Sequence, residues 1–188
     1  MALATRIIME HFQRGDRWIV YCDDSVQLGS VKESLRAAGC PEVLEYHTAM
    51  DGDPSRTLGL FEVHGGVMVS IRCLDEGVDI PSVTHALILA SSKNPREYVQ
   101  RRGRVLRRAP RKSLAHVHDV LVTPVLNDID PPSISIVQGE LARAIEFGRG
   151  ALNPGCITDL ERIAVQYGMN PADVVAAGLE DEDDQETT

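Results

Sequence analysis

The sequence predicts an α/β fold, with a doubly wound, mostly parallel sheet followed by a small helical appendage. Three observations lead to this prediction. Short apolar runs alternate with amphipathic segments over the first two thirds of the 188 residues. Glycines, prolines and short polar side chains mark the changes between them. After Pro131-Pro132 only helical periodicity remains. Strands interleaved with helices favour a parallel sheet, because each parallel connection needs a crossover.

Five apolar runs are expected to form the strands of this sheet. In chain order they cover residues 18–22, 43–46, 67–71, 84–89 and 115–122. Continuous apolar runs of this length are typical of strands that are buried on both faces. Gly65-Gly66 breaks the chain before the third strand, and Pro81 precedes the fourth.

The connections between these strands are expected to contain helices. The first covers residues 26–38, with Asp23-Asp24-Ser25 as its N-terminal cap and Gly39 at its C-terminal cap. The second begins at Pro54 and continues to Phe61 or beyond. The third opens at Pro95 and runs through a cluster of arginines.

The last part of the chain is expected to be a helical appendage, with helices over residues 137–147, 157–167 and 171–177. We therefore expect a main lobe over residues 1–125 and an appendage over residues 133–179. Residues 180–188 are acidic and poor in apolar side chains, which predicts a disordered tail.

The net charge of −9 is an average over segments of opposite sign. Residues 93–112 hold nine basic side chains and one acidic one, whereas residues 173–188 hold seven acidic side chains and no basic one. A uniformly acidic surface would exclude nucleic acid, because phosphate binding needs basic groups. The distribution leaves that partner open.

Cysteine usage and apolar runs indicate a cytoplasmic protein. The four cysteines lie far apart and form no C-x-x-C pair, so we expect free thiols in a reducing compartment. No run of 18 apolar residues predicts a membrane span, and the first residues, M-A-L-A-T-R, lack a signal-peptide pattern.

The strongest chemical motif is Q-R-R-G-R-V-L-R, at residues 100–107. Arg104 and Arg107 are three residues apart, so on a helix they share one face. Two neighbouring guanidinium groups suit a phosphate chain, and Gly103 removes a side chain beside them. On this octapeptide alone, a solvated basic helix is an equally good interpretation.

A second motif, D-E-G-V-D-I-P, occupies residues 75–81 after the third strand. Gly77 permits an unusual backbone angle, Asp79 offers an acceptor to a hydroxyl group, and Pro81 ends the loop. On its own it would be an ordinary acidic turn. Ligands of doubly wound sheets bind at the carboxyl ends of the strands, where this loop and residues 23–25 and 90–94 are expected.

Taken in order, these segments resemble the second RecA-like lobe of superfamily 2 helicases and translocases, a lobe of the P-loop NTPase type. E-G-V-D-I-P is similar to motif V, Q-R-R-G-R-V-L-R to motif VI, and W-I-V-Y-C-D-D-S to motif IV. Tyr46-His47-Thr48, Arg56 and Phe61 fit the pattern between them. Motif VI begins with Gln, as in the restriction-enzyme and XPB-like branches, whereas DEAD-box proteins have His there. The resemblance covers residues 17–123.

The resemblance implies that ATP with Mg²⁺ binds between this lobe and a first lobe. At the matching positions, Arg104 and Arg107 are the arginine fingers on the γ-phosphate, and Gln100 places the phosphate or the attacking water. The positions implied on the nucleotide side of the lobe are Gly77, Asp79 and Gly103.

The resemblance also implies a nucleic-acid track. The residues expected to lie near its phosphates are Asp24, Ser25, His47, Ser70 and Arg72. Ile71 stands where many members have Thr or Ser, and Arg72 offers a charge beside the lost hydroxyl. From the residues alone, Asp24 is explained as a helix cap and His47 equally well as a packed side chain.

The sequence holds no G-x-x-x-x-G-K-[ST] phosphate loop and no D-E-x-H or D-E-A-D cluster. We therefore expect the chain to be inactive alone, with a first lobe supplied upstream or by another subunit. The main interpretation is the motor lobe of an ATP-dependent DNA helicase or translocase in restriction, phage defence or repair, with RNA a possible track. A non-catalytic nucleic-acid-binding or protein-interaction module is the alternative. A standalone nucleotide-binding protein is disfavoured because the glycine-rich loop is missing.

His116, His118 and Asp119 form an H-x-H-D pattern on the fifth strand. Alternate residues of a strand share a face, so the two histidines could contribute to a metal site. The pattern includes no cysteine or further ligand, which favours packing or edge residues. No metal site is predicted within this chain.

Overall fold

The computed structural model describes residues 2–71, 80–89, 103, 105–110, 112–125, 131–153 and 155–176. The chain divides into two compact units, Met1–Val120 and Leu121–Thr188. Most of the helix expected from Pro95 and all of the acidic tail lie outside the described residues.

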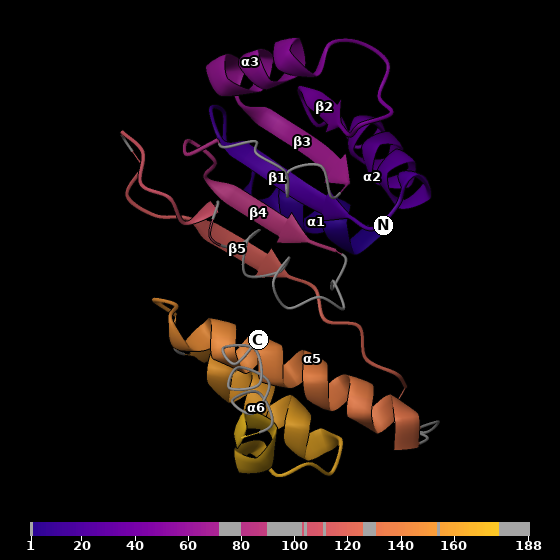
Figure 1. The fold of residues 1–188 in the computed structure, drawn as a ribbon, viewed down its shortest axis with the longest axis vertical. Coiled ribbons are helices and arrows are strands. Elements are labelled where there is room, and N and C mark those ends of the chain that lie inside the picture. The colour runs from indigo at the N-terminus through magenta and orange to yellow at the C-terminus, as the bar shows by residue number, and fades with distance from the viewer. Residues whose placement is uncertain are drawn as a thin grey trace, which may run out of the picture. The chain divides into compact units, whose positions relative to one another are not determined.

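The first unit is built on a five-stranded sheet in which every neighbouring pair is parallel, in the order β2-β3-β1-β4-β5 (Figure 1). The strands are β1 (Arg17–Cys22), β2 (Val43–Tyr46), β3 (Gly66–Ile71), β4 (His85–Ile88) and β5 (His116–Asp119). This confirms the predicted fold class and all five strands. The fourth and fifth strands are shorter than predicted.

The central strand, β1, is buried on both faces. Residues 18–22 are at most 3% exposed. One face of the sheet carries Trp18, Val20 and Cys22, which pack with helices α1 (Ala2–His11) and α2 (Ser25–Ala37) in the main core. Burial on both faces is why the strands read as continuous apolar runs rather than as alternating ones.

Helix α3 (Pro54–His64) lies between β2 and β3 in the chain and packs against both strands. The chain moves across the sheet in one direction from β1 to β2 and back from β2 to β3. Right-handed crossovers therefore place α2 and α3 on opposite faces, which makes the sheet doubly wound. Helix α1, which covers the same face as α2, was not predicted.

Local signals set the ends of α2 and β3 as the sequence predicted. The Asp24 carboxylate accepts a hydrogen bond from the Gln27 amide at 2.7 Å and so caps α2. Gly39 follows the helix with φ of +78°, in the left-handed region that glycine adopts most readily. Gly66 starts β3 with φ of +107°, and a Cβ there would lie 2.5 Å from the Glu42 carbonyl oxygen.

The second unit consists of helices α5 (Pro131–Arg149) and α6 (Gly155–Gln166) and a helical turn over residues 171–176. The first of these extends beyond the predicted range at both ends. Its buried side chains lie at helical spacing and include Val137, Leu141 and Ile145. Tyr167 donates a hydrogen bond to the Pro124 carbonyl within this unit.

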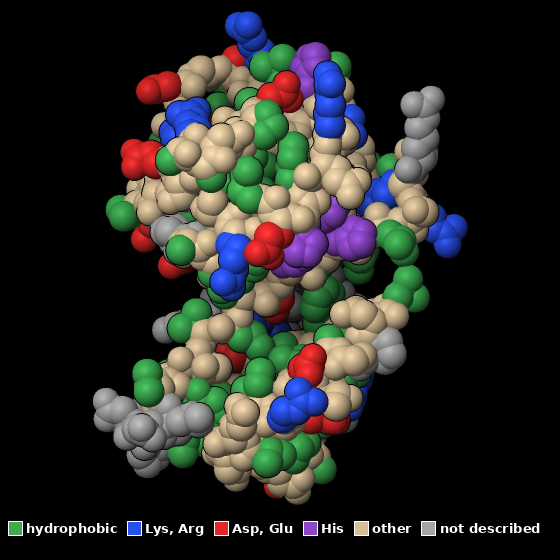
Figure 2. Space-filling model, turned by 180° about the vertical axis from the view of Figure 1, so that it is seen from behind, with side chains coloured by type: hydrophobic (Ala, Val, Ile, Leu, Met, Phe, Trp, Pro, Cys, Tyr) green, Lys and Arg blue, Asp and Glu red, His purple; other side chains and the backbone are tan. Residues whose placement is uncertain are grey.

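A stack of aromatic rings joins the amino ends of three strands. The Trp18 and His85 rings lie 4.3 Å apart and 6° from parallel, and His85 stacks on His116 at 4.7 Å. His118 also stacks on Trp18, at 5.3 Å, and its ring lies 5.2 Å from that of His11 of α1. We call His11, His85, His116 and His118 the histidine cluster. Figure 2 shows histidine side chains gathered on the surface of this unit.

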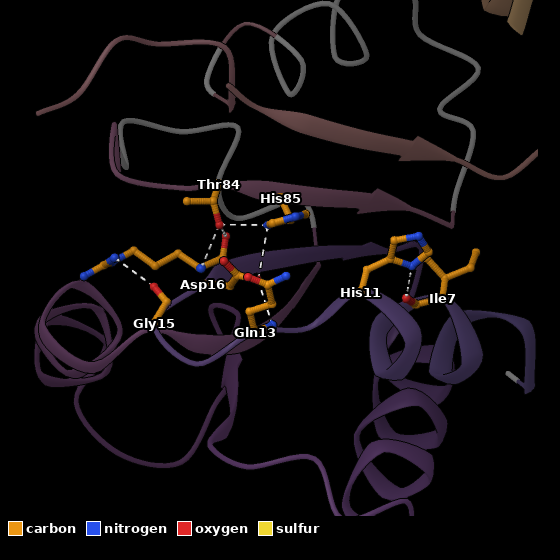
Figure 3. Close-up of polar contacts among 8 residues, drawn as sticks. Ile7, His11, Gln13, Gly15, Asp16, Thr84 and His85 are labelled. Atoms are coloured by element: carbon orange, nitrogen blue, oxygen red, sulfur yellow. Dashed lines mark hydrogen bonds and ion pairs between the residues drawn. The ribbon is translucent and has the colours of Figure 1, made fainter. Parts of the chain in front are cut away.

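Polar contacts hold His85 at the base of this cluster (Figure 3). Its Nδ1 lies 2.8 Å from the Thr84 hydroxyl, which also accepts a hydrogen bond from the Arg17 amide. The Asp16 carboxylate lies 3.9 Å from the same Nδ1. The arrangement agrees with the packing interpretation of the H-x-H-D pattern, since His116 and His118 both lie in ring stacks.

Burial makes the histidine cluster sensitive to acid. Burial lowers the pKa of His85 to about 4; Asp16 opposes this, and the other three histidines of the cluster reinforce it. Burial, with His11 and His116, also lowers the pKa of His118. Because an unfolded histidine titrates near pH 6.5, the unfolded chain takes up protons below that pH that the folded chain does not. The contribution of these two histidines to stability is therefore full well above pH 6.5, and it is lost as pH drops from about 6.5 toward their folded pKa values.

We predict that denaturant unfolding of the chain will show lower stability at pH 5.5 than at pH 7.5. His85→Phe keeps a ring in the stack but removes the titrating group, so its stability should depend less on pH, with about one proton fewer taken up on unfolding. His64→Gln, which removes an exposed histidine from the end of α3, is the matched control. An identical pH slope in His85→Phe and the wild type would contradict the assignment.

Candidate functional site

The register of the sheet brings the carboxyl ends of the strands to one edge. Cys22 of β1 pairs with Ile71 of β3, and Tyr21 pairs with Ile88 of β4. Tyr46, at the end of β2, pairs with Ser70 of β3. The chain therefore leaves every strand at the same edge, where doubly wound sheets bind their ligands. We call this the carboxyl edge.

Asp24 and Ser25 follow β1 at the carboxyl edge, and both are exposed. The Asp24 carboxylate is engaged as the cap of α2, while the Gln27 side chain accepts a hydrogen bond from the Asp23 amide at 2.8 Å. This exchange fixes the turn between β1 and α2. The structure thus gives Asp24 the capping role, and a phosphate contact by this pair stays a prediction.

His47 follows β2 and is held by charged neighbours. Its Nε2 lies 3.4 Å from one oxygen of Glu45, and the other oxygen of that carboxylate accepts a hydrogen bond from Lys32 of α2. The hydrogen bond from Lys32 is the largest cause that lowers the pKa of the Glu45 carboxyl group, and His47 lowers this pKa further. The His47 side chain is 15% exposed, so it combines packing with limited access to solvent at the carboxyl edge.

Ser70, near the end of β3, lies inside the sheet. It is fully buried, and its hydroxyl donates a hydrogen bond to the Val20 carbonyl at 3.4 Å. Alternation along β3 points this side chain into the sheet face rather than toward the edge. The structure thus gives the Ser70 hydroxyl a hydrogen bond inside the sheet, and its contact with a nucleic-acid phosphate stays a prediction.

In the described part of the arginine motif, one residue is buried and the others are exposed to solvent. Val105 is 1% exposed, whereas Gly103 and Arg107 are exposed. A Cβ at Gly103 would meet no heavy atom within 4 Å, so the glycine leaves free space on this surface. An exposed guanidinium beside open backbone is suited to a ligand or surface approaching from outside the lobe.

One functional candidate was not singled out in the sequence. Lys112, the last residue of the basic stretch, donates hydrogen bonds to three backbone carbonyls. A lysine just beyond the end of a helix is a known partner of terminal carbonyls, and that pattern could have identified it.

Several predicted site residues lie outside the described residues. They are Gln100 and Arg104 of the arginine motif, Gly77 and Asp79 of the second motif, and Arg72. Their roles stay as the resemblance implies them.

Two further features of the described part bear on function. No group of three or more His, Cys, Asp or Glu side chains in it is arranged to hold a metal ion. No helix in it is both long and apolar enough to cross a membrane. Cys22 and Cys40 are free and buried, and burial raises the pKa of Cys22 to about 12, so neither thiol is ionised at neutral pH.

Comparison with solved structures agrees with this architecture. E. coli SrmB, a DEAD-box protein solved with regulator of ribonuclease activity A, matches with 24% identity and a TM-score of 0.50, over 63% of this chain and 69% of that one. The C-terminal domain of the DEAD-box protein Dbp5 matches with 19% identity and a TM-score of 0.53, over 80% and 82%. S. cerevisiae Dbp5 bound to RNA and ADP BeF3 matches with 19% identity and a TM-score of 0.53, over 75% of this chain and 34% of that one.

At these identities the likeness establishes the fold, which is that of a helicase C-terminal RecA-like lobe, as predicted. No similar sequence was found among curated proteins. The family described as the helicase conserved C-terminal domain matches residues 2–109, which includes the sheet strands β1 to β4 and the arginine motif. The chain therefore belongs to the helicase conserved C-terminal domain family.

Proposed function

We propose that the chain is the C-terminal motor lobe of an ATP-dependent helicase or translocase that acts on DNA. The observation that carries this proposal is the family match over residues 2–109, within which the two ligand motifs follow strands of one parallel sheet. Hydrolysis needs a first lobe, because this sequence has no phosphate loop.

The described residues fit the triphosphate side of such a site. Arg107 is exposed and always charged, and its planar guanidinium matches phosphate oxygens. Open space at Gly103 lets a ligand or the facing lobe approach the backbone. ATP with Mg²⁺ supplies the phosphoryl group for transfer. We assign the Mg²⁺ ligands to the first lobe, as the family resemblance implies.

In this proposal, Arg104 and Arg107 stabilise the negative charge that develops on the transferred phosphoryl group. Arginine fingers act in this way because the guanidinium binds the transition state more strongly than the ground state. Gln100 orients the phosphate or the attacking water. The second motif, through Gly77 and Asp79, couples the nucleotide to the nucleic-acid track.

The track is assigned to the carboxyl edge, beside Ser25, His47 and Arg72. DNA is preferred because motif VI starts with Gln100, as in the restriction-enzyme and XPB-like branches that the sequence resembles. Dbp5, whose fold is similar, was solved with RNA, so RNA is the competing track to be tested.

We predict that Arg104→Ala and Arg107→Ala, each placed in the protein that carries both lobes, will lower kcat for ATP by roughly 10³-fold or more while ATP binding is largely kept. Steady-state ATPase assays and nucleotide binding measure the two effects separately. Arg108→Ala is the control, because Arg108 is an exposed neighbour outside the motif. Normal turnover in both finger variants would refute the assignment.

We also predict that this chain alone will show negligible ATPase activity, with or without nucleic acid. The measurement is phosphate release from ATP by the purified chain, and the Arg107→Ala variant of the same chain is the matched control. Robust turnover that disappears in Arg107→Ala would show that a complete site forms without a first lobe, and it would contradict the two-lobe mechanism.

A third prediction concerns the track itself. Affinity for a labelled single-stranded oligonucleotide should fall as salt rises, because phosphate contacts release counterions. Anisotropy titrations with DNA and RNA of the same sequence, at several salt concentrations, measure both the slope and the preference. An affinity that does not change with salt concentration would argue against a nucleic-acid track. If RNA binds more tightly than DNA, RNA replaces DNA as the proposed substrate.

A further inference from the structure

One lysine of the basic stretch is turned inward. The Lys112 ammonium donates hydrogen bonds to the backbone carbonyls of Pro81 at 3.1 Å, Val105 at 2.5 Å and Arg107 at 2.9 Å. An ammonium group has three N–H donors and no acceptor, so these three carbonyls use its full capacity. Lys112 therefore has no donor left for a phosphate, unlike the role expected of a basic residue in this stretch.

The three carbonyls belong to the two ligand motifs. Pro81 closes the second motif, E-G-V-D-I-P, and Val105 and Arg107 lie in the arginine motif. Lys112 is 31 residues from the first and only seven and five residues from the others. A single side chain thus connects the end of one motif to the backbone of the other.

Two of the three acceptor peptides lie at or beside buried side chains. Ile80, beside Pro81, is 5% exposed, and Val105 is 1% exposed. The Lys112 amide closes a turn to the Ala109 carbonyl at 3.1 Å, which sets where the lysine stem begins. Burial lowers the pKa of Lys112, so the ammonium depends on the carbonyl dipoles for its solvation. The donor and two of its acceptors are therefore held by the structure around them, whereas the exposed Arg107 receives its hydrogen bond from Lys112.

We propose that Lys112 is the positioning residue of the arginine finger Arg107. Its ammonium binds the backbone of Arg107 and so holds that backbone in a fixed place relative to the second motif. This inference rests on the proposed function of Arg107. A finger acts only when its guanidinium meets the transferred phosphoryl group, and a displacement of about 1 Å can cost about 100-fold in rate. Hydrogen bonds to the finger's own carbonyl set the point from which its side chain extends.

The test uses the protein that carries both lobes. Lys112→Met keeps the length of the stem and removes all three donors. We expect kcat for ATP to fall by roughly 10- to 100-fold, with little change in the KM for ATP, because the finger contributes mainly to the transition state. Arg162→Met is the control, since it removes a cation that pairs with Asp159 on α6, outside both motifs and outside the proposed track. It should leave kcat unchanged.

A double-mutant cycle separates positioning from a general loss of structure. If Lys112 acts through the finger, Lys112→Met should lower kcat little further once Arg107→Ala is present. An equal fold-loss in both backgrounds would overturn the proposal, as would normal kcat in Lys112→Met. If Lys112→Met fails to fold, Lys112→Arg replaces it. That variant keeps charge and bulk, but its rigid fork does not reproduce the three converging bonds, so unchanged kcat in it would also overturn the proposal.

Failure of this inference differs from failure of the proposed function. Normal turnover in Arg107→Ala removes the finger itself and both proposals with it. Loss of turnover in Arg107→Ala with normal turnover in Lys112→Met leaves the finger in place and overturns only the role of Lys112.

Discussion

The parallel register around β1 is the constraint on which the rest of the first unit depends. Residues 18–22 are buried on both faces and pair with β3 on one side and β4 on the other. Because all five strands run in the same direction, the chain leaves each of them at the carboxyl edge. Residues that are far apart in the sequence, such as Asp24 and His47, therefore follow strands at the same edge without any contact between them being specified locally.

The same register brings the histidine cluster together. Trp18, His85 and His116 lie at or near the first residue of their strands, so the histidine cluster sits at the amino ends of the sheet. Protonation of the cluster therefore acts on folding through the amino ends of these strands.

Features set by neighbouring residues could be predicted from the sequence, and features set by pairing across the sheet could not. Asp24 and Gly39 end α2 by local hydrogen bonds and backbone angles, and both were predicted. The direction of the Ser70 side chain depends on which face of β3 it occupies, and a run that is apolar on both faces does not reveal that. The stacking of His85 on His116 depends on β4 lying beside β5, which strand order alone decides.

Helix α1 is another feature that could not be predicted from neighbouring residues alone. Its apolar residues Ala4 and Ile8 are buried only because Trp18 and its neighbours offer a face to cover. The segment carries no cap signal as clear as that of Asp24, so its helix depends on tertiary packing more than on local sequence.

Lys112 shows how charge in a sequence can mislead about its use. Nine basic residues in residues 93–112 suggest one surface for anions. In the structure Arg107 is exposed, whereas the Lys112 ammonium donates its hydrogen bonds to backbone carbonyls. Backbone carbonyl oxygens carry partial negative charge. The Lys112 ammonium is therefore stabilised by carbonyls inside the protein, as an exposed basic side chain would be stabilised by a phosphate. This basic stretch therefore contains both the exposed Arg107, which is the proposed finger, and a lysine that binds the Arg107 backbone.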